Sequence, residues 1–150
     1  MYEIGETGIF AGSVPAGMAG ATTTESDVTT GSSQQKTIAL VFGAVFTLVG
    51  VLGPVLGGAG DPLIVFGRNY IHDAIHVASG LAGLAAGAYA GGRYAGGYLK
   101  LFGAVYLVVT VAGFALMGLF ESLINLNMAD NVLHLVLAVA LLGAGFGLDE

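Results

Sequence analysis

The chain has 150 residues, of which 55% are apolar, 26 are glycine and 9% are charged. Its mean hydropathy of +0.85 is too high for a soluble domain of this size and predicts an integral membrane protein. Four basic residues against ten acidic ones give a formal net charge of −6, which excludes a basic surface for nucleic acid. The absence of cysteine excludes disulfides, thiolate metal sites and thiol catalysis.

The first 36 residues differ in composition from the rest of the chain. Gly, Ser, Thr and Gln dominate from Gly12 to Gln35, and no apolar period persists there. We therefore expect residues 1–36 to form a flexible tail that precedes a transmembrane domain at residues 37–150.

Four apolar segments of about twenty residues follow, at about 37–57, 71–90, 98–119 and 131–148. Each is predicted to be one α-helix, because an open strand would leave backbone groups unpaired in lipid. The fold class is therefore all-α, an integral membrane four-helix bundle. Lys36, Arg93 and Lys100 fall on one side of the membrane and Arg68 on the other. Three lysines and arginines against one predict a cell-membrane protein with both termini in the cytoplasm.

The sequence also contains an internal repeat. Residues 42–58 align with residues 102–118 at an offset of 60, and nine of the 17 positions are identical. At an offset of 58, Asn69 falls on Asn127 and His76 on His134. The repeating unit is then a two-helix hairpin. Two spans return the chain to its starting side, so the two hairpins are predicted to be parallel, with a pseudo-twofold axis along the membrane normal.

Small residues form a row with a spacing of four along the second predicted helix: Ser79, Gly83, Gly87 and Gly91. Small rows let two helix backbones approach closely, which drives helix association in lipid. We interpret this row as internal packing of the bundle, with an oligomer contact or a pore lining as the alternatives.

Polar residues gather at the outer ends of the second and fourth helices. This predicted interhelical cluster consists of Asn69, His72, Asp73, His76, Asn127, Asp130, Asn131 and His134. The asparagines and aspartates are typical of helix N-caps, where a side-chain oxygen accepts from an unpaired backbone N–H group. We therefore expect these five residues to cap the two helices.

The histidines need another explanation, because His76 and His134 lie a turn or so inside their helices. A helix N-terminus disfavours a cationic imidazolium. We expect both rings to be neutral and hydrogen-bonded across the bundle, to each other or to an Asn or Asp of the other hairpin. The alternative is a ligand site in which His72, His76 and His134 bind a transition metal, or His76 and His134 bind a haem iron. A continuous proton or ion path is disfavoured, because few polar residues lie within the spans.

The strings RNYIHDAIHVASGLAGLAAG and NMADNVLHLVLAVALLGAG, with FGAVY opening the third span, resemble a prokaryotic membrane family known as domain of unknown function 4383. The resemblance covers about Lys36 to Leu148 and implies four spans. It also implies a polar signature at Asn69, His72, Asp73, His76, Asp130, Asn131 and His134, although Asn is commoner in the family at the position of Asp73. The family implies no established activity or cofactor.

Taken together, these patterns predict a small multi-pass membrane protein that acts as a structural or accessory module, as a subunit of a larger assembly or as a homo-oligomer. No enzyme motif is present, so we expect no catalytic activity and no cofactor. The alternative function is a redox-linked protein that binds haem or a metal through His76 and His134. A small transporter is the third candidate.

Overall fold

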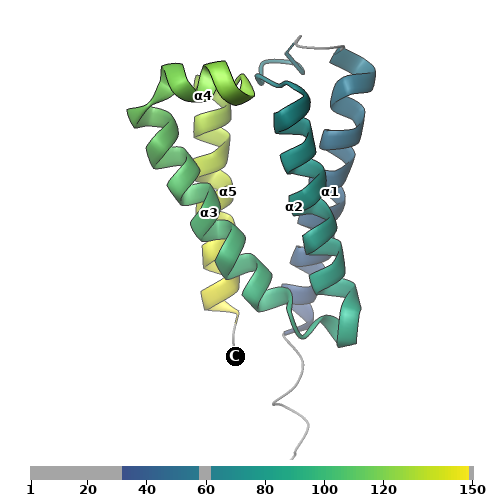
Figure 1. Ribbon diagram of the computed structural model, residues 1–150. Coiled ribbons are helices and arrows are strands. Elements are labelled where there is room, and N and C mark those ends of the chain that lie inside the picture. The colour runs from purple at the N-terminus through teal and green to yellow at the C-terminus, as the bar shows by residue number, and fades with distance from the viewer. Residues whose placement is uncertain (1–31, 58–61, 149–150) are drawn as a thin grey trace, which may run out of the picture.

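The computed structural model describes residues 32–57 and 62–148 (Figure 1). The described residues form four long helices, one short helix and one 3-10 turn: α1 (Ser33–Gly57), α2 (Tyr70–Ala88), η1 (Tyr89–Gly92), α3 (Ala95–Ala115), α4 (Met117–Ile124) and α5 (Met128–Gly147). Helices α1, α3 and α5, and α2 together with η1, are long and apolar enough to cross a membrane. The predicted tail lies outside the described residues as far as residue 31.

Helix α1 begins at Ser33, four residues before the predicted start of the first span. The hydroxyl of Ser32 accepts a hydrogen bond from the backbone N–H of Gln35 at 3.2 Å, as an N-cap does. Gln35 is buried, and its side-chain amide donates to the carbonyl of Gly145 at 3.2 Å. Residues 33–36 therefore belong to the helix and not to the tail, and Gln35 docks the start of α1 against the end of α5.

The third predicted span, 98–119, is divided into two helices. Helix α3 ends at Ala115, and the backbone leaves the helical region at Leu116 (φ −129°, ψ 40°) before α4 starts. Helix α4 lies across the end of the bundle and ends at Ile124, where it is followed by Asn125 with a left-handed backbone (φ 54°) (Figure 1). The apolar composition continues through this break, so hydropathy could not locate it.

Two antiparallel hairpins, α1–α2 and α3–α5, make up the bundle, and most contacts between helices lie within a hairpin. Glycines bring the backbones together in both. A Cβ atom on Gly43 of α1 would lie 2.6 Å from the backbone nitrogen of Leu84 in α2. A Cβ atom on Gly103 of α3 would lie 2.9 Å from the backbone nitrogen of Leu142 in α5. Such close backbone approach is typical of helices that associate in lipid.

Three members of the predicted small row on α2 face neighbouring helices. Ser79, Gly83 and Gly87 are buried. The phenol of Tyr98 packs at Gly83 and donates to the carbonyl of Ser79 at 3.2 Å. Gly91 differs from the other three: it lies in η1 with a φ of 73° and has open space at its Cβ position. This glycine serves the turn into α3 and does not belong to the packing row.

The core between the hairpins is small. Its buried side chains come from α1, α3 and α5: Ala39, Phe46, Ala95, Tyr98, Leu99, Tyr106, Ala138 and Leu141. Most large aliphatic side chains instead point outward, as with Val55 and Leu56 on α1 or Val108 and Val111 on α3. An outward apolar surface of this extent matches a bilayer and would be unstable in water.

We expect Gly43→Ala to destabilise the protein and Gly143→Ala to leave it as stable as the wild type. The added methyl of Gly43→Ala meets backbone atoms of α2, which cannot move independently, whereas nothing lies within 4 Å of the Cβ position at Gly143. Overpacking of this kind costs about 1–3 kcal/mol. Thermal unfolding in detergent measures both variants, and equal Tm values would contradict the close α1–α2 packing.

Candidate functional site

The three histidines meet at the end of the bundle that carries α4. His72 and His76 lie four residues apart on α2, and His134 comes from α5. The Nε2 atoms of His76 and His72 are 3.2 Å apart. The rings of His72 and His134 meet edge to face with their centroids 6.0 Å apart. One ring nitrogen from each histidine lies within 4.8 Å of the other two. The structure thus brings together the histidines that the sequence grouped.

Helix capping fixes where α2 and α5, the helices that carry these histidines, begin. The side-chain oxygen of Asn69 accepts from the backbone N–H of His72 at 2.9 Å. Asn127 caps α5 in the same way, accepting from Ala129 at 2.8 Å and from Asp130 at 3.1 Å. The carboxylate of Asp130 accepts in return from the backbone N–H of Asn127 at 2.9 Å, which completes a capping box. The capping prediction is therefore confirmed for Asn69, Asn127 and Asp130.

Asp73 and Asn131 do not cap the helices. The Asp73 carboxylate forms an ion pair with Arg68, in which Nη2 and Oδ2 are 2.6 Å apart and Nε lies 3.1 Å from both oxygens. Both side chains are about 95% buried, with exposures of 5% and 6%. Asn131 is fully buried, and its amide donates to the sulfur of Met117 at 3.8 Å. Both residues come four positions after the capping asparagine, beyond the first-turn N–H groups that a cap can reach.

The linker before α2, residues 62–69, is hydrogen-bonded to the second hairpin. The backbone N–H of Gly67 donates to Oδ2 of Asp130 at 2.9 Å, and the side chain of Asn125 donates to the carbonyl of Arg68 at 2.9 Å. A Cβ atom on Gly67 would collide with the backbone of Asn125, so this position requires glycine. The linker therefore lies directly over the histidines.

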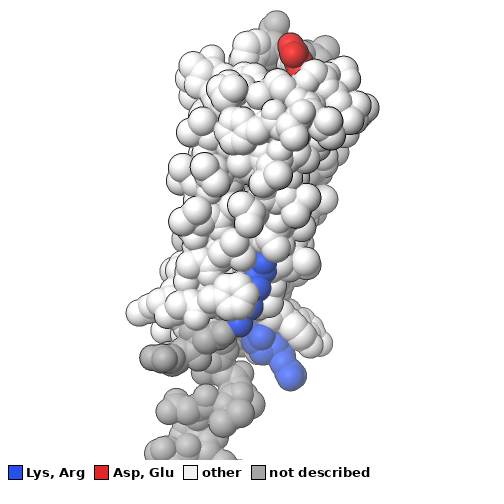
Figure 2. Space-filling view, turned by 90° about the vertical axis from the view of Figure 1, so that its left-hand side faces the viewer, with Lys and Arg blue, Asp and Glu red and all other residues white. Residues whose placement is uncertain are grey.

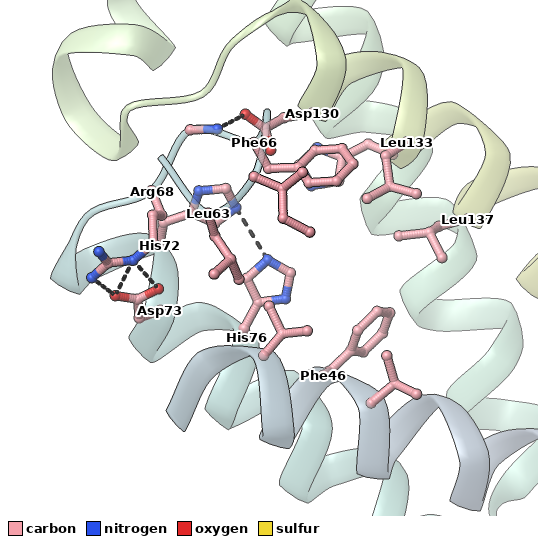
Figure 3. Close-up of a pocket in the computed structure, with 15 residues that line it drawn as sticks. Phe46, Leu63, Phe66, Arg68, His72, Asp73, His76, Asp130, Leu133 and Leu137 are labelled. Carbon is pink, nitrogen blue, oxygen red and sulfur yellow. Dashed lines mark hydrogen bonds and ion pairs between the residues drawn. The ribbon is translucent and has the colours of Figure 1, made fainter. Parts of the chain in front are cut away.

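A cavity of about 260 Å³ lies between this linker, α1 and the two histidine-bearing helices (Figure 3). Its polar wall contains the three histidines, Asp130 and the Arg68–Asp73 pair. Its apolar wall is formed by Val45, Phe46, Val49, Leu63, Ile64, Phe66, Leu133 and Leu137. The cavity thus combines several nitrogen and oxygen groups with an apolar surface.

The hydrogen bonding of the histidines differs from the prediction. We expected His76 to bond across the bundle, but its recorded partner is His72, one turn away on the same helix. A separation of four residues places two side chains on one helix face, which explains the pairing. The Nδ1 atoms of all three histidines are buried without a hydrogen-bond partner among the described residues.

Sequence reasoning also missed the aromatic rings beside the histidines. Phe46 lies 5.8 Å from His76, and Tyr106 lies 5.2 Å from His134, between ring centroids. Phe46 and Tyr106 are themselves 5.5 Å apart. Phe46 and Tyr106 align with each other at the repeat offset of 60, and this alignment is the sequence signal that could have identified them.

These rings bear on the kind of cofactor that the site suits. Pockets for drug-sized ligands measure about 300–1,000 Å³, so the cavity is too small for a porphyrin. Phe46 and Tyr106 also fill the space beside His76 and His134. The residues therefore do not suit a haem between His76 and His134, whereas a single ion needs no such space.

We expect Arg68→Gln to destabilise the protein by about 3–5 kcal/mol, because it leaves the buried Asp73 carboxylate without its counter-charge. The double variant Arg68→Gln with Asp73→Asn should recover much of that loss, since the uncompensated charge is gone. Arg93→Gln, at an exposed position, is the matched control and should behave as the wild type. Thermal unfolding in detergent measures all three. A double variant no more stable than Arg68→Gln would show that the buried charge is not the cause.

Comparison with known proteins places this architecture in a family. Neither a curated protein nor a solved structure matches the chain. The profile of one family matches residues 36–147, which include the four long helices except the first residues of α1, the linker, and every member of the polar cluster. The chain therefore belongs to the family described as domain of unknown function 4383 (DUF4383).

Proposed function

We propose that this protein is a non-enzymatic accessory module of the cell membrane, built from two parallel hairpin repeats about a pseudo-twofold axis along the membrane normal. One observation carries the architecture. The side-chain amide of Asn69 donates to the carbonyl of Leu123 at 3.0 Å, and that of Asn127 donates to the carbonyl of Val65 at 2.9 Å. Asn127 follows Asn69 by 58 positions, as Leu123 follows Val65. Reciprocal contacts of this kind are what a twofold axis generates.

Contacts inside the hairpins support the same proposal. The contact of Gly43 with Leu84 corresponds to that of Gly103 with Leu142 at the repeat offsets of 60 and 58. The ring contact of Phe46 with His76 likewise corresponds to that of Tyr106 with His134.

Further pairs follow the same offsets. A Cβ atom on Gly53 would meet the side chain of Asp73, and one on Gly113 would meet that of Asn131. Equivalent positions in the two hairpins thus make equivalent contacts, which a chance sequence match would not produce.

The accessory role rests on what the polar groups do and on one exposed surface. The polar groups at the outer end cap helices, form an ion pair or hold the linker in place. These groups therefore have a structural role. On α5, Ala140, Gly143 and Gly147 form an exposed small-residue row, and nothing lies within 4 Å of the Cβ position of either glycine. Such a row allows the helix of another chain to approach closely. We propose that a second copy or a partner membrane protein packs there.

The proposed topology has both termini in the cytoplasm. On the face shown in Figure 2, the described basic side chains lie toward one end of the bundle and a red acidic patch lies at the other. Lys36, Arg93 and Lys100 lie at the end of the bundle where α1 begins and α2 passes into α3. The larger number of lysines and arginines at that end supports its cytoplasmic placement.

Cysteine labelling tests this topology, since the chain contains no cysteine of its own. Ser33 and Ser122 are both exposed, at opposite ends of the bundle. In intact cells, a membrane-impermeant maleimide should label Ser122→Cys and should label Ser33→Cys only after the cells are opened. The reverse pattern would overturn the topology.

The association surface is tested by Gly143→Leu and Gly147→Leu. Both should abolish crosslinking of the protein to its neighbour in the membrane, while Tm in detergent stays near the wild-type value because the substitutions point away from the bundle. Val108→Leu, on the exposed face of α3, is the matched control and should retain crosslinking. Unchanged crosslinking in the glycine variants would refute this surface.

A further inference from the structure

The histidine cluster exceeds what a scaffold needs. Three imidazoles from two separate hairpins converge on the wall of one cavity, with a nitrogen from each inside a 4.8 Å limit. We propose that His72, His76 and His134 bind one divalent transition-metal ion, and that an open coordination position of this ion faces the cavity. This site is independent of the accessory role proposed above.

The distances suit such an ion. Zinc binds imidazole nitrogens at about 2.0–2.1 Å in tetrahedral geometry, which sets two ligand nitrogens about 3.3 Å apart. The Nε2 atoms of His72 and His76 are 3.2 Å apart. One ring nitrogen of His134 lies within 4.8 Å of a ring nitrogen from each of the other two histidines, so it has to approach by about 1.5 Å at most. A small rotation of one side chain therefore completes a set of three ligands.

The hydrogen bond within the cluster can be exchanged for coordination of an ion. A neutral imidazole carries a proton on only one nitrogen. In the bond between His72 and His76, one ring donates and the other accepts through Nε2. An ion bound by both Nε2 atoms replaces this bond and leaves the ring protons on Nδ1, which has no hydrogen-bond partner among the described residues in either case. Coordination therefore gives the converging lone pairs a common partner at the cost of one hydrogen bond.

The donor set fits a transition ion better than calcium or magnesium. Imidazole suits zinc, copper, iron and nickel, whereas calcium and magnesium prefer oxygen ligands. His72 and His76 have the i, i+4 spacing by which one helix face presents two histidines to zinc.

The charges near the site suit a cation. Arg68 neutralises Asp73, which leaves Asp130 as the other carboxylate in the cavity wall. Asp130 is held by the N–H groups of Gly67 and Asn127, so it supplies negative charge near the ion from a fixed position.

Three protein ligands leave the fourth tetrahedral position vacant, as in zinc sites that bind an exchangeable water. The cavity of about 260 Å³ has room for a water or a small anion at that position. Apolar side chains of α1 and α5, such as Val45 and Leu137, form part of its wall. An exogenous ligand would therefore reach the ion through a largely apolar cavity.

Metal binding is tested on the full chain, purified in detergent without a polyhistidine tag. We expect one Zn²⁺ or Co²⁺ per chain, an increase in Tm with Zn²⁺ but not with Mg²⁺, and an intense visible spectrum of four-coordinate Co²⁺. Added azide should change that spectrum, because it occupies the open position. Substoichiometric metal with no Tm shift would overturn the proposal, and a spectrum insensitive to azide would overturn the open position.

His72→Gln, His76→Gln and His134→Gln locate the site. Each should keep the metal-free Tm near that of the wild type, since an amide retains a donor and an acceptor, yet weaken Zn²⁺ binding by more than about tenfold. Tyr106→Phe, beside His134 but outside the three-histidine ligand set, is the matched control and should bind as the wild type does. Wild-type affinity in all three glutamine variants would overturn the assignment. If a variant fails to fold, the Tm shift of the wild-type protein still decides.

Discussion

Two asparagine side chains link the hairpins and determine how the polar cluster is arranged at the α4 end of the bundle. Asn69 and Asn127 each use the side-chain oxygen to cap their own helix and the side-chain nitrogen to donate to a backbone carbonyl of the other hairpin. Each amide thus satisfies backbone groups that would otherwise be unpaired near the membrane, where such groups are costly. Because the caps set where α2 and α5 begin, they also set the height of His76 and His134.

Much of the fold could be predicted because lipid imposes simple rules. Apolar length identified the four spans, and capping chemistry identified Asn69 and Asn127. The break at Leu116 could not be predicted, because an apolar segment has the same hydropathy whether it spans the membrane or lies across the end of a bundle. The start of α1 could not be predicted either, because Gln35 fits the polar composition of the tail. Its hydrogen bond to the carbonyl of Gly145 is known only from the structure.

The candidate site was predictable in its membership and less so in its contacts. Residue type and spacing were enough to group the histidines. The partner of Asp73 was not predicted, because it is a residue that precedes α2. Arg68 was assigned a role in topology only, although its guanidinium is buried against that carboxylate. In the second hairpin the positions equivalent to Arg68 and Asp73 hold Leu126 and Asn131, both fully buried. The proposed repeat thus replaces an ion pair by an apolar residue and an amide.

The same comparison explains why the site is asymmetric. At the repeat offset of 58, His72 corresponds to Asp130, and His76 to His134. Each hairpin therefore contributes two polar residues four positions apart to one cavity, but only one hairpin has histidine at both. An exact duplicate would have placed four imidazoles there. The aspartate instead provides an anion that also holds the linker at Gly67.

The concentration of contacts within each hairpin affects the order of assembly. Contacts between neighbours in sequence form quickly, because little chain entropy is lost in closing a short loop. The first hairpin can form its internal contacts before α5 has been synthesised, because both of its helices precede α5 in the chain. His134 is carried by α5 and reaches the cluster only when the second hairpin docks. The three-histidine arrangement is therefore completed by α5, the last of the described helices, and a chain that lacks α5 presents only the pair on α2.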